Sequence, residues 1–194
     1  MPWSTVLPQA VFTSPILSVA APIAAGTFIG FQTNKQSRTK SIYRNLHKPP
    51  LYPPAWLFGP VWTILYGLMG FAAHHATVTG TTVSPLASSS LQQWTVHSQH
   101  LYASQLLLNY LWMPLFFGLR KPAWALADML LLAGNVAALM HAWYRHDRPA
   151  FWMLVPYAAW LGFATYLNAG VGVLNQWTIG DKEGEGEGEA KKEE

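Results

Sequence analysis

The hydrophobic positions of this chain gather into five long stretches, separated by segments that are polar, charged or rich in proline. Each stretch is about 20 residues long, which matches a hydrocarbon core of about 30 Å at 1.5 Å of rise per helical residue. The apolar residues do not alternate with polar ones, as the strands of a membrane barrel require. The pattern predicts an all-α fold, an integral membrane bundle of five transmembrane helices over residues 11–31, 55–76, 101–119, 123–144 and 151–174.

The composition supports a membrane environment. Hydrophobic residues make up 51% of the chain and charged residues only 11%, whereas soluble domains carry about 25% charged residues. The absence of cysteine excludes disulfides and Cys-ligated metals. No basic stripe with base-stacking aromatic residues lies outside the apolar stretches, so no nucleic-acid partner is expected.

The loops differ sharply in charge. Residues 32–54 contain five Lys or Arg and no acid, and two more basic residues follow the third stretch at Arg120 and Lys121. The opposite side holds only Arg145 and Arg148. The positive-inside rule therefore predicts that the more basic side and the C-terminus are cytosolic. Residues 1–174 form the predicted transmembrane domain, and residues 175–194 form a charged, Gly/Glu-rich tail that we expect to be disordered and cytosolic.

Few groups inside the stretches can carry acid–base or metal chemistry. Asp128 is the only acid there and no lysine is present, which argues against a proton relay or a Schiff base. His97 and His100 share a helical face, but no further ligand stands at helical spacing, so interfacial histidines are the simpler interpretation. We predict no metal site, no obligatory cofactor and no conventional catalytic residue.

Four of the stretches place aromatic and polar residues at helical spacing. Polar groups are costly against lipid, so these stripes should face the bundle interior. The residues concerned are Trp62 and Tyr66, Asn109 and Trp112, Trp124 and Asp128, and Trp160, Ala164, Leu167 and Asn168. Converging rings and polar groups suit a flat, apolar ligand with polar edges. The alternative is that the rings only fill the core and that Asp128 pairs with a Trp N–H or a backbone group.

Small residues in the first stretch offer a close-packing face. Gly26 and Gly30 form a GxxxG pattern, which lets helix backbones approach closely. This face predicts a homodimer, with packing inside the bundle as the alternative.

Four blocks of sequence together resemble one family. The blocks are Leu46–Gly70, which contains the run His-Lys-Pro-Pro-Leu-Tyr-Pro-Pro-Ala-Trp, then Gln105–Phe117, Trp124–Asp128 and Pro156–Asn168. In order and content they are similar to the TspO/MBR family, which comprises tryptophan-rich sensory proteins, translocator proteins and the peripheral-type benzodiazepine receptor. The likeness covers roughly residues 40–170.

The resemblance implies a membrane receptor or carrier, often dimeric, for porphyrins such as protoporphyrin IX and haem. It implies a cavity closed by the loop between the first two spans, a link to tetrapyrrole or sterol transport and stress response, and, in eukaryotes, the outer mitochondrial membrane. The ligand-binding positions carried over are Phe58, Trp62, Tyr66, Asn109, Trp112, Trp124, Trp160, Phe163, Ala164 and Leu167.

Two alternatives to a receptor remain open. Some members of the family look able to degrade porphyrin in light, which would give Trp62 and Trp160 a photo-oxidative role. A membrane scaffold that acts through protein partners is the other. The sequence also departs from animal members, because no Tyr and no basic residue follow Asn168 before Lys182. The pattern associated with sterol binding is therefore missing. Leu51 stands where many members carry Trp.

Overall fold

A computed structural model describes residues 7–34, 44–82 and 89–179, and all of the regular structure in these ranges is helical. In chain order the elements are α1 (Gln9–Thr13), α2 (Pro15–Asn34), α4 (Ala55–Thr82), α5 (Ser89–Met113), the π-helix η1 (Pro114–Gly118), α6 (Pro122–His146) and α7 (Arg148–Leu174). The all-α prediction is confirmed. The expectations for residues 180–194 and for Lys35, Arg38 and Lys40 lie outside the described residues.

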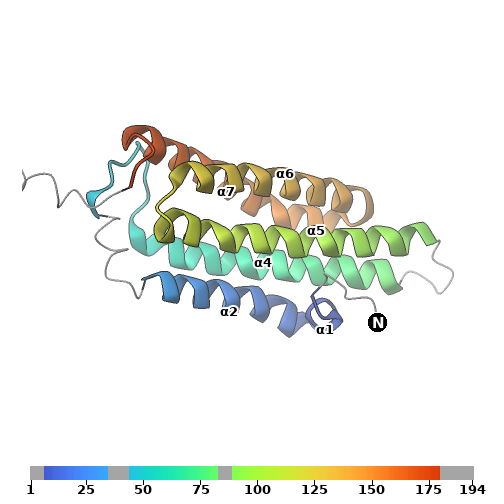
Figure 1. The fold of residues 1–194 in the computed structure, drawn as a ribbon. Helices are drawn as coiled ribbons and strands as arrows, with labels where there is room; N and C mark the ends of the chain where they lie inside the picture. Colours follow the sequence, from blue (N-terminus) through green and yellow to red (C-terminus); the bar gives the residue numbers. More distant parts are fainter. Residues whose placement is uncertain (1–6, 35–43, 83–88, 180–194) are drawn as a thin grey trace, which may run out of the picture.

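The long helices run side by side (Figure 1). α4 contacts α2, α5 and α7, and α6 packs between α5 and α7. One end of the bundle carries residues 44–54, η1 and the residues after α7, and the other carries α1, the end of α4 and the α6–α7 connection. The described basic residues of the predicted cytosolic side, Arg44, Lys48, Arg120 and Lys121, thus belong to segments at a single end.

Four helices in the described ranges are long and apolar enough to cross a membrane, over Pro15–Thr33, Ala55–Thr81, Pro122–His146 and Arg148–Leu174. Their outer faces expose large apolar side chains such as Phe28, Leu131 and Trp152, as lipid contact requires. The third predicted stretch falls on the second half of α5 and on η1. The first half of α5 is rich in Ser, Gln and His, and the whole helix is therefore less apolar than the others.

The first predicted stretch is interrupted by proline. α1 ends at Thr13, Ser14 is extended with φ −92° and ψ 120°, and α2 begins at Pro15. A residue that precedes proline is pushed out of the helical region, which explains the break. The interruption lets Phe12 turn into the core, where its ring meets Tyr102 edge-on at 5.9 Å between centroids.

A second proline changes the helix type at the end of the third predicted stretch. Pro114 opens η1, in which the Leu119 amide donates to the Pro114 carbonyl at 2.8 Å. Proline cannot donate to the carbonyl four residues earlier, so the helix loses a hydrogen bond there and widens. The widened turn brings Phe116 onto Trp112, stacked at 5.1 Å between ring centroids.

Glycines let α2 approach α4 closely, but they do not act as one motif. A Cβ at Gly26 would collide with the Tyr66 ring, whereas a Cβ at Gly30 would meet nothing within 4 Å. Half of the GxxxG pattern is therefore used inside the bundle, and the homodimer stays a prediction. The tightest point of the α2–α4 crossing is Gly70, where a Cβ would overlap the Ser18 carbonyl oxygen.

We predict that Gly70→Ala destabilises the bundle by about 1–3 kcal/mol, because the added methyl group must push the α2 backbone away. Gly67→Ala is the matched control on the same helix, since its Cβ would find its nearest neighbours at 4.0 Å. That control should be neutral or slightly stabilising, because alanine is the better helix former. Thermal denaturation of the two variants in detergent measures the difference, and equal melting temperatures would contradict the tight crossing.

Candidate functional site

Four polar side chains form a hydrogen-bonded chain in the interior. The Tyr66 hydroxyl on α4 donates to Asn109 Oδ1 on α5 at 2.7 Å, and Asn109 Nδ2 donates to the Tyr157 hydroxyl on α7 at 3.2 Å. Tyr157 in turn donates to Gln105 Oε1 at 3.1 Å. Each hydroxyl and amide is buried, so the chain satisfies polar groups that lipid could not.

Aromatic rings lie in two groups, one toward the end of the bundle that carries residues 44–54 and one beside this hydrogen-bonded chain. Tyr52 meets Phe58 at 6.2 Å, and Phe58 meets Trp160 edge-on at 6.0 Å between centroids. Trp160 lies 5.7 Å from Phe163. Trp62 packs on Tyr66 at 5.3 Å and on Tyr157 at 6.3 Å. We call these seven residues the ring series: Tyr52, Phe58, Trp62, Tyr66, Tyr157, Trp160 and Phe163.

One fully buried polar atom among the residues of the ring series has no hydrogen-bond partner. The Nε1–H of Trp160 is buried and finds no hydrogen-bond acceptor among the described residues. An unsatisfied buried donor costs about 1–3 kcal/mol. Such a group is therefore available to an acceptor on a ligand, and Ala164, one turn along α7, is a small residue beside it.

Trp112 packs in a second cluster at the same end. Trp112 Nε1 donates to Asn168 Oδ1 at 3.1 Å, and Asn168 Nδ2 donates to the Pro122 carbonyl at 3.1 Å. Asn168 thereby links α5, α6 and α7, and Leu167 beside it is buried. The Nε1–H of Trp112 is therefore already paired within the protein.

Trp124 lies apart from the other predicted residues. Its side chain is 68% exposed on the outside of α6. The prediction that Trp124 and Asp128 both face the interior is therefore wrong for Trp124 and confirmed for Asp128. Asp128 is buried, and its Oδ2 has no partner among the described residues. The alternative in which Asp128 pairs with a Trp N–H or a backbone group is therefore not observed for this oxygen. Trp124 stands at the edge of the buried stripe and in the first turn of α6, where the ring can remain outside.

Residues 44–54 close the end of the bundle as a lid. The His47 amide donates to Asn175 Oδ1 at 3.1 Å, and Asn175 Nδ2 donates back to the His47 carbonyl at 2.9 Å. The Tyr166 hydroxyl donates to the Pro50 carbonyl at 3.1 Å. Pro49 packs where a Cβ on Gly170 would stand. Residues 175–179, assigned to the tail from sequence, contribute to this contact surface, since Trp177 covers Gly172 and Ile179 is buried.

A cavity of about 150 Å³ lies at the opposite end of the bundle, beside Trp143, and a shallow groove runs along the outside of α6 beside Trp177. Neither hollow is lined by a predicted ligand-binding residue. A ligand that enters between Phe58 and Trp160, or between Trp62 and Tyr66, would have to separate rings that are now in contact.

Two members of the interior site were missed from sequence. Gln105 stands four residues before Asn109, and Tyr157 stands three before Trp160 and eleven before Asn168, so both fall on the stripes already identified. Extending each stripe by one turn toward the N-terminus would have found them. Asp147 was also missed: it caps α7 by accepting from the Ala150 amide at 2.9 Å and pairs with His75 at 2.8 Å.

The family model and the individual relatives that match this chain all point to the same family. The model of the TspO/MBR family matches residues 18–174. The translocator protein homolog of Schizosaccharomyces pombe is 42% identical over 154 residues, covering 79% of this chain and 87% of that protein. The translocator protein of Homo sapiens is 41% identical over 131 residues, covering 65% and 70%. The tryptophan-rich sensory protein of Cereibacter sphaeroides is 35% identical over 159 residues, covering 82% and 87%.

We predict that the interior hydrogen bonds are energetically coupled. Asn109→Leu gives a side chain of similar branching without polar atoms, so the Tyr66 hydroxyl loses its acceptor while the Tyr157 hydroxyl keeps only its bond to Gln105; the change should lower the free energy of unfolding by about 1–3 kcal/mol. Tyr66→Phe removes the first bond alone and should cost less. The double variant should be more stable than the sum of the single effects, with a coupling of about 0.5–2 kcal/mol. Melting of all three variants in detergent tests this, and strict additivity would contradict the observed chain.

Proposed function

This chain belongs to the TspO/MBR family, and on that premise we propose that it is a membrane receptor or carrier for porphyrins and related flat, apolar ligands. The observation that carries the proposal is the ring series with the unpaired Trp160 Nε1–H in its middle. Aromatic faces stack on flat conjugated ligands, at about 0.5–1.5 kcal/mol per ring pair. The proposed membrane topology has five spans, with α5 and η1 as the remaining one, and a cytosolic C-terminus.

Ligand entry in this proposal requires the lid to open. The lid is held by a few polar bonds through His47, Asn175 and Tyr166 and by Pro49 against Gly170. Phe58 lies just after the lid and contacts both Tyr52 and Trp160. Opening of the lid would therefore loosen the ring series from its outer end and expose the Trp160 donor to the entering ligand.

The lid also supplies a cation for an acidic ligand. Lys48 Nζ lies 5.6 Å from the centroid of the Tyr52 ring, at the outer end of the ring series. A molecule with an apolar body and an anionic edge would place its body among the rings and its carboxylate at this end. Protoporphyrin IX and haem have this form, with propionates on one side of a flat macrocycle.

We predict that Ala164→Leu weakens porphyrin binding at least about tenfold, equivalent to about 1.4 kcal/mol. The reason is steric, because the larger side chain occupies space beside Trp160 that the ligand needs. The measurement is titration of the purified protein with protoporphyrin IX in the dark, followed by tryptophan fluorescence quenching. Ala159→Leu is the matched control, since Ala159 is on the same helix but exposed on its outer face, and it should bind normally.

The outcome that contradicts the binding site is an Ala164→Leu variant that melts much earlier yet binds porphyrin as before. In that case Ala164 only fills the core, and the rings are packing. The same titration repeated under illumination separates receptor from enzyme. A new absorption band that forms only in light, only with protein, and is lost in Trp160→Phe would replace the receptor by a porphyrin-degrading activity.

We predict that Lys48→Gln lowers affinity for protoporphyrin IX about threefold to fivefold, the range of an exposed ion pair. Affinity for its uncharged dimethyl ester should not change, because the ester has no carboxylate to pair. Lys121→Gln, a second exposed cation at the same end, serves as the control and should leave both ligands unaffected. Equal losses for acid and ester in Lys48→Gln would show a role in the lid rather than in charge recognition.

A further inference from the structure

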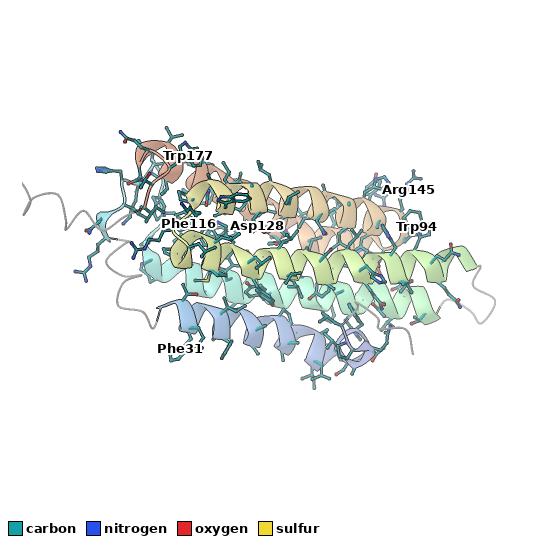
Figure 2. The ribbon with its side chains drawn as sticks, viewed as in Figure 1. Phe31, Trp94, Phe116, Asp128, Arg145 and Trp177 are labelled. Carbon is teal, nitrogen blue, oxygen red and sulfur yellow. The ribbon has the colours of Figure 1, made fainter. Side chains whose placement is uncertain are left out.

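The cavity of about 150 Å³ lies between α4, α5 and α6, away from the ring series. Its wall contains Thr79, which stands 17 residues after Trp62 on α4, a separation of about 25 Å along a helix at 1.5 Å per residue. Figure 2 shows Trp94 of the cavity wall near Arg145 at one end of the bundle, with Phe116 and Trp177 at the other. The cavity is thus independent of the lid and of the proposed porphyrin site.

Aromatic side chains form much of the wall. Trp94 on α5 packs against His146 on α6, with ring centroids 4.9 Å apart and an angle of 34° between the planes. Trp143 is only 2% exposed and forms another part of the wall. Close packing of α4 on α5 bounds the cavity, because a Cβ at Gly80 would collide with the Thr95 hydroxyl. The wall is mainly apolar.

One donor in this wall is unpaired. The Nε1–H of Trp143 is buried without an acceptor among the described residues. Several neighbouring polar groups are engaged: Ser98 Oγ donates to the Thr95 carbonyl at 2.9 Å, and Thr95 Oγ1 donates to the Leu91 carbonyl at 3.0 Å. Asp147 accepts from the Ala150 amide at 2.9 Å and pairs with His75 at 2.8 Å. Among the described residues of the wall, the Trp143 Nε1–H is therefore the polar group that is fully buried and still has no hydrogen-bond partner.

These features define the chemistry of an occupant. An anion would face the buried Asp147 carboxylate, and a cation would compete with His75 for it, so a neutral molecule is favoured. The donor of Trp143 requires one acceptor, such as a carbonyl oxygen. An apolar cavity of about 150 Å³ takes a single benzene ring. We propose that this cavity is a second small-molecule site, which binds a neutral single-ring compound carrying one hydrogen-bond acceptor.

The test uses acetophenone and α-methylstyrene, which have nearly the same shape and differ in the carbonyl oxygen. The full chain, labelled with ¹⁵N-tryptophan in lipid nanodiscs, is titrated with each probe and followed through its indole N–H resonances. Trp143→Phe identifies the resonance of Trp143. Acetophenone should shift that resonance downfield in a saturable way, because the indole gains an acceptor. α-Methylstyrene should bind more weakly and without the downfield shift.

Two variants make the assignment specific. Trp143→Phe should weaken the binding of acetophenone about fivefold to tenfold, the range of one hydrogen bond. Binding to this variant is measured from the indole resonance of Trp94. The affinity for α-methylstyrene should not change. Ala142→Leu should fill the cavity and abolish both responses, whereas Ala138→Leu, at an exposed position one turn earlier, should abolish neither. Shifts that do not saturate, or equal weakening of both probes in Trp143→Phe, would overturn the proposal. Porphyrin titration of Ala142→Leu should be unchanged, so this site and the porphyrin site stand or fall separately.

Discussion

Lipid cannot hydrogen-bond the polar side chains inside this bundle, and this constraint determines how its helices are joined. The Tyr66–Asn109–Tyr157–Gln105 chain ties α4, α5 and α7 together. Asn168 repeats the arrangement for α5, α6 and α7 through Trp112 and the Pro122 carbonyl. In a bilayer the hydrophobic effect hardly favours helix–helix contact over contact with the surrounding lipid acyl chains. Hydrogen bonds between specific side chains therefore fix which helix faces meet. The same hydrogen bonds orient the aromatic rings that lie next to them.

The parts of the fold that follow from length and polarity were predictable from the sequence. Apolar runs located the helices, and the cost of polar groups in lipid turned Asn109, Asp128 and Asn168 inward. The details that depend on neighbours were not. The break at Ser14 and the π-helix at Pro114 follow from proline chemistry, but a proline such as Pro60 lies inside a continuous helix. Which outcome a proline gives depends on whether nearby groups satisfy the freed carbonyl.

The tryptophans show why periodicity located some site residues and misplaced others. Trp112 uses its N–H to hold Asn168, whereas Trp124 and Trp152 face outward. Trp143 and Trp160 are buried with unpaired N–H groups. All five stand in apolar stretches and are alike in sequence. Helical spacing assigns a ring to a stripe, but whether its N–H finds an acceptor depends on residues from other helices. The two unpaired indoles could therefore be recognised only in three dimensions.

In the proposed site, the ring series and the lid together would limit how tightly a ligand binds. A ligand inserted between paired rings replaces contacts that already exist, such as Phe58 on Trp160 or Trp62 on Tyr157, so the net gain from stacking is reduced. The apparent affinity is also reduced by the fraction of molecules whose lid is open. The Trp160 donor differs, because the closed state offers it no acceptor. Pairing it removes a cost already present in the free protein. Selectivity should therefore depend more on where a ligand carries an acceptor than on how large its aromatic surface is.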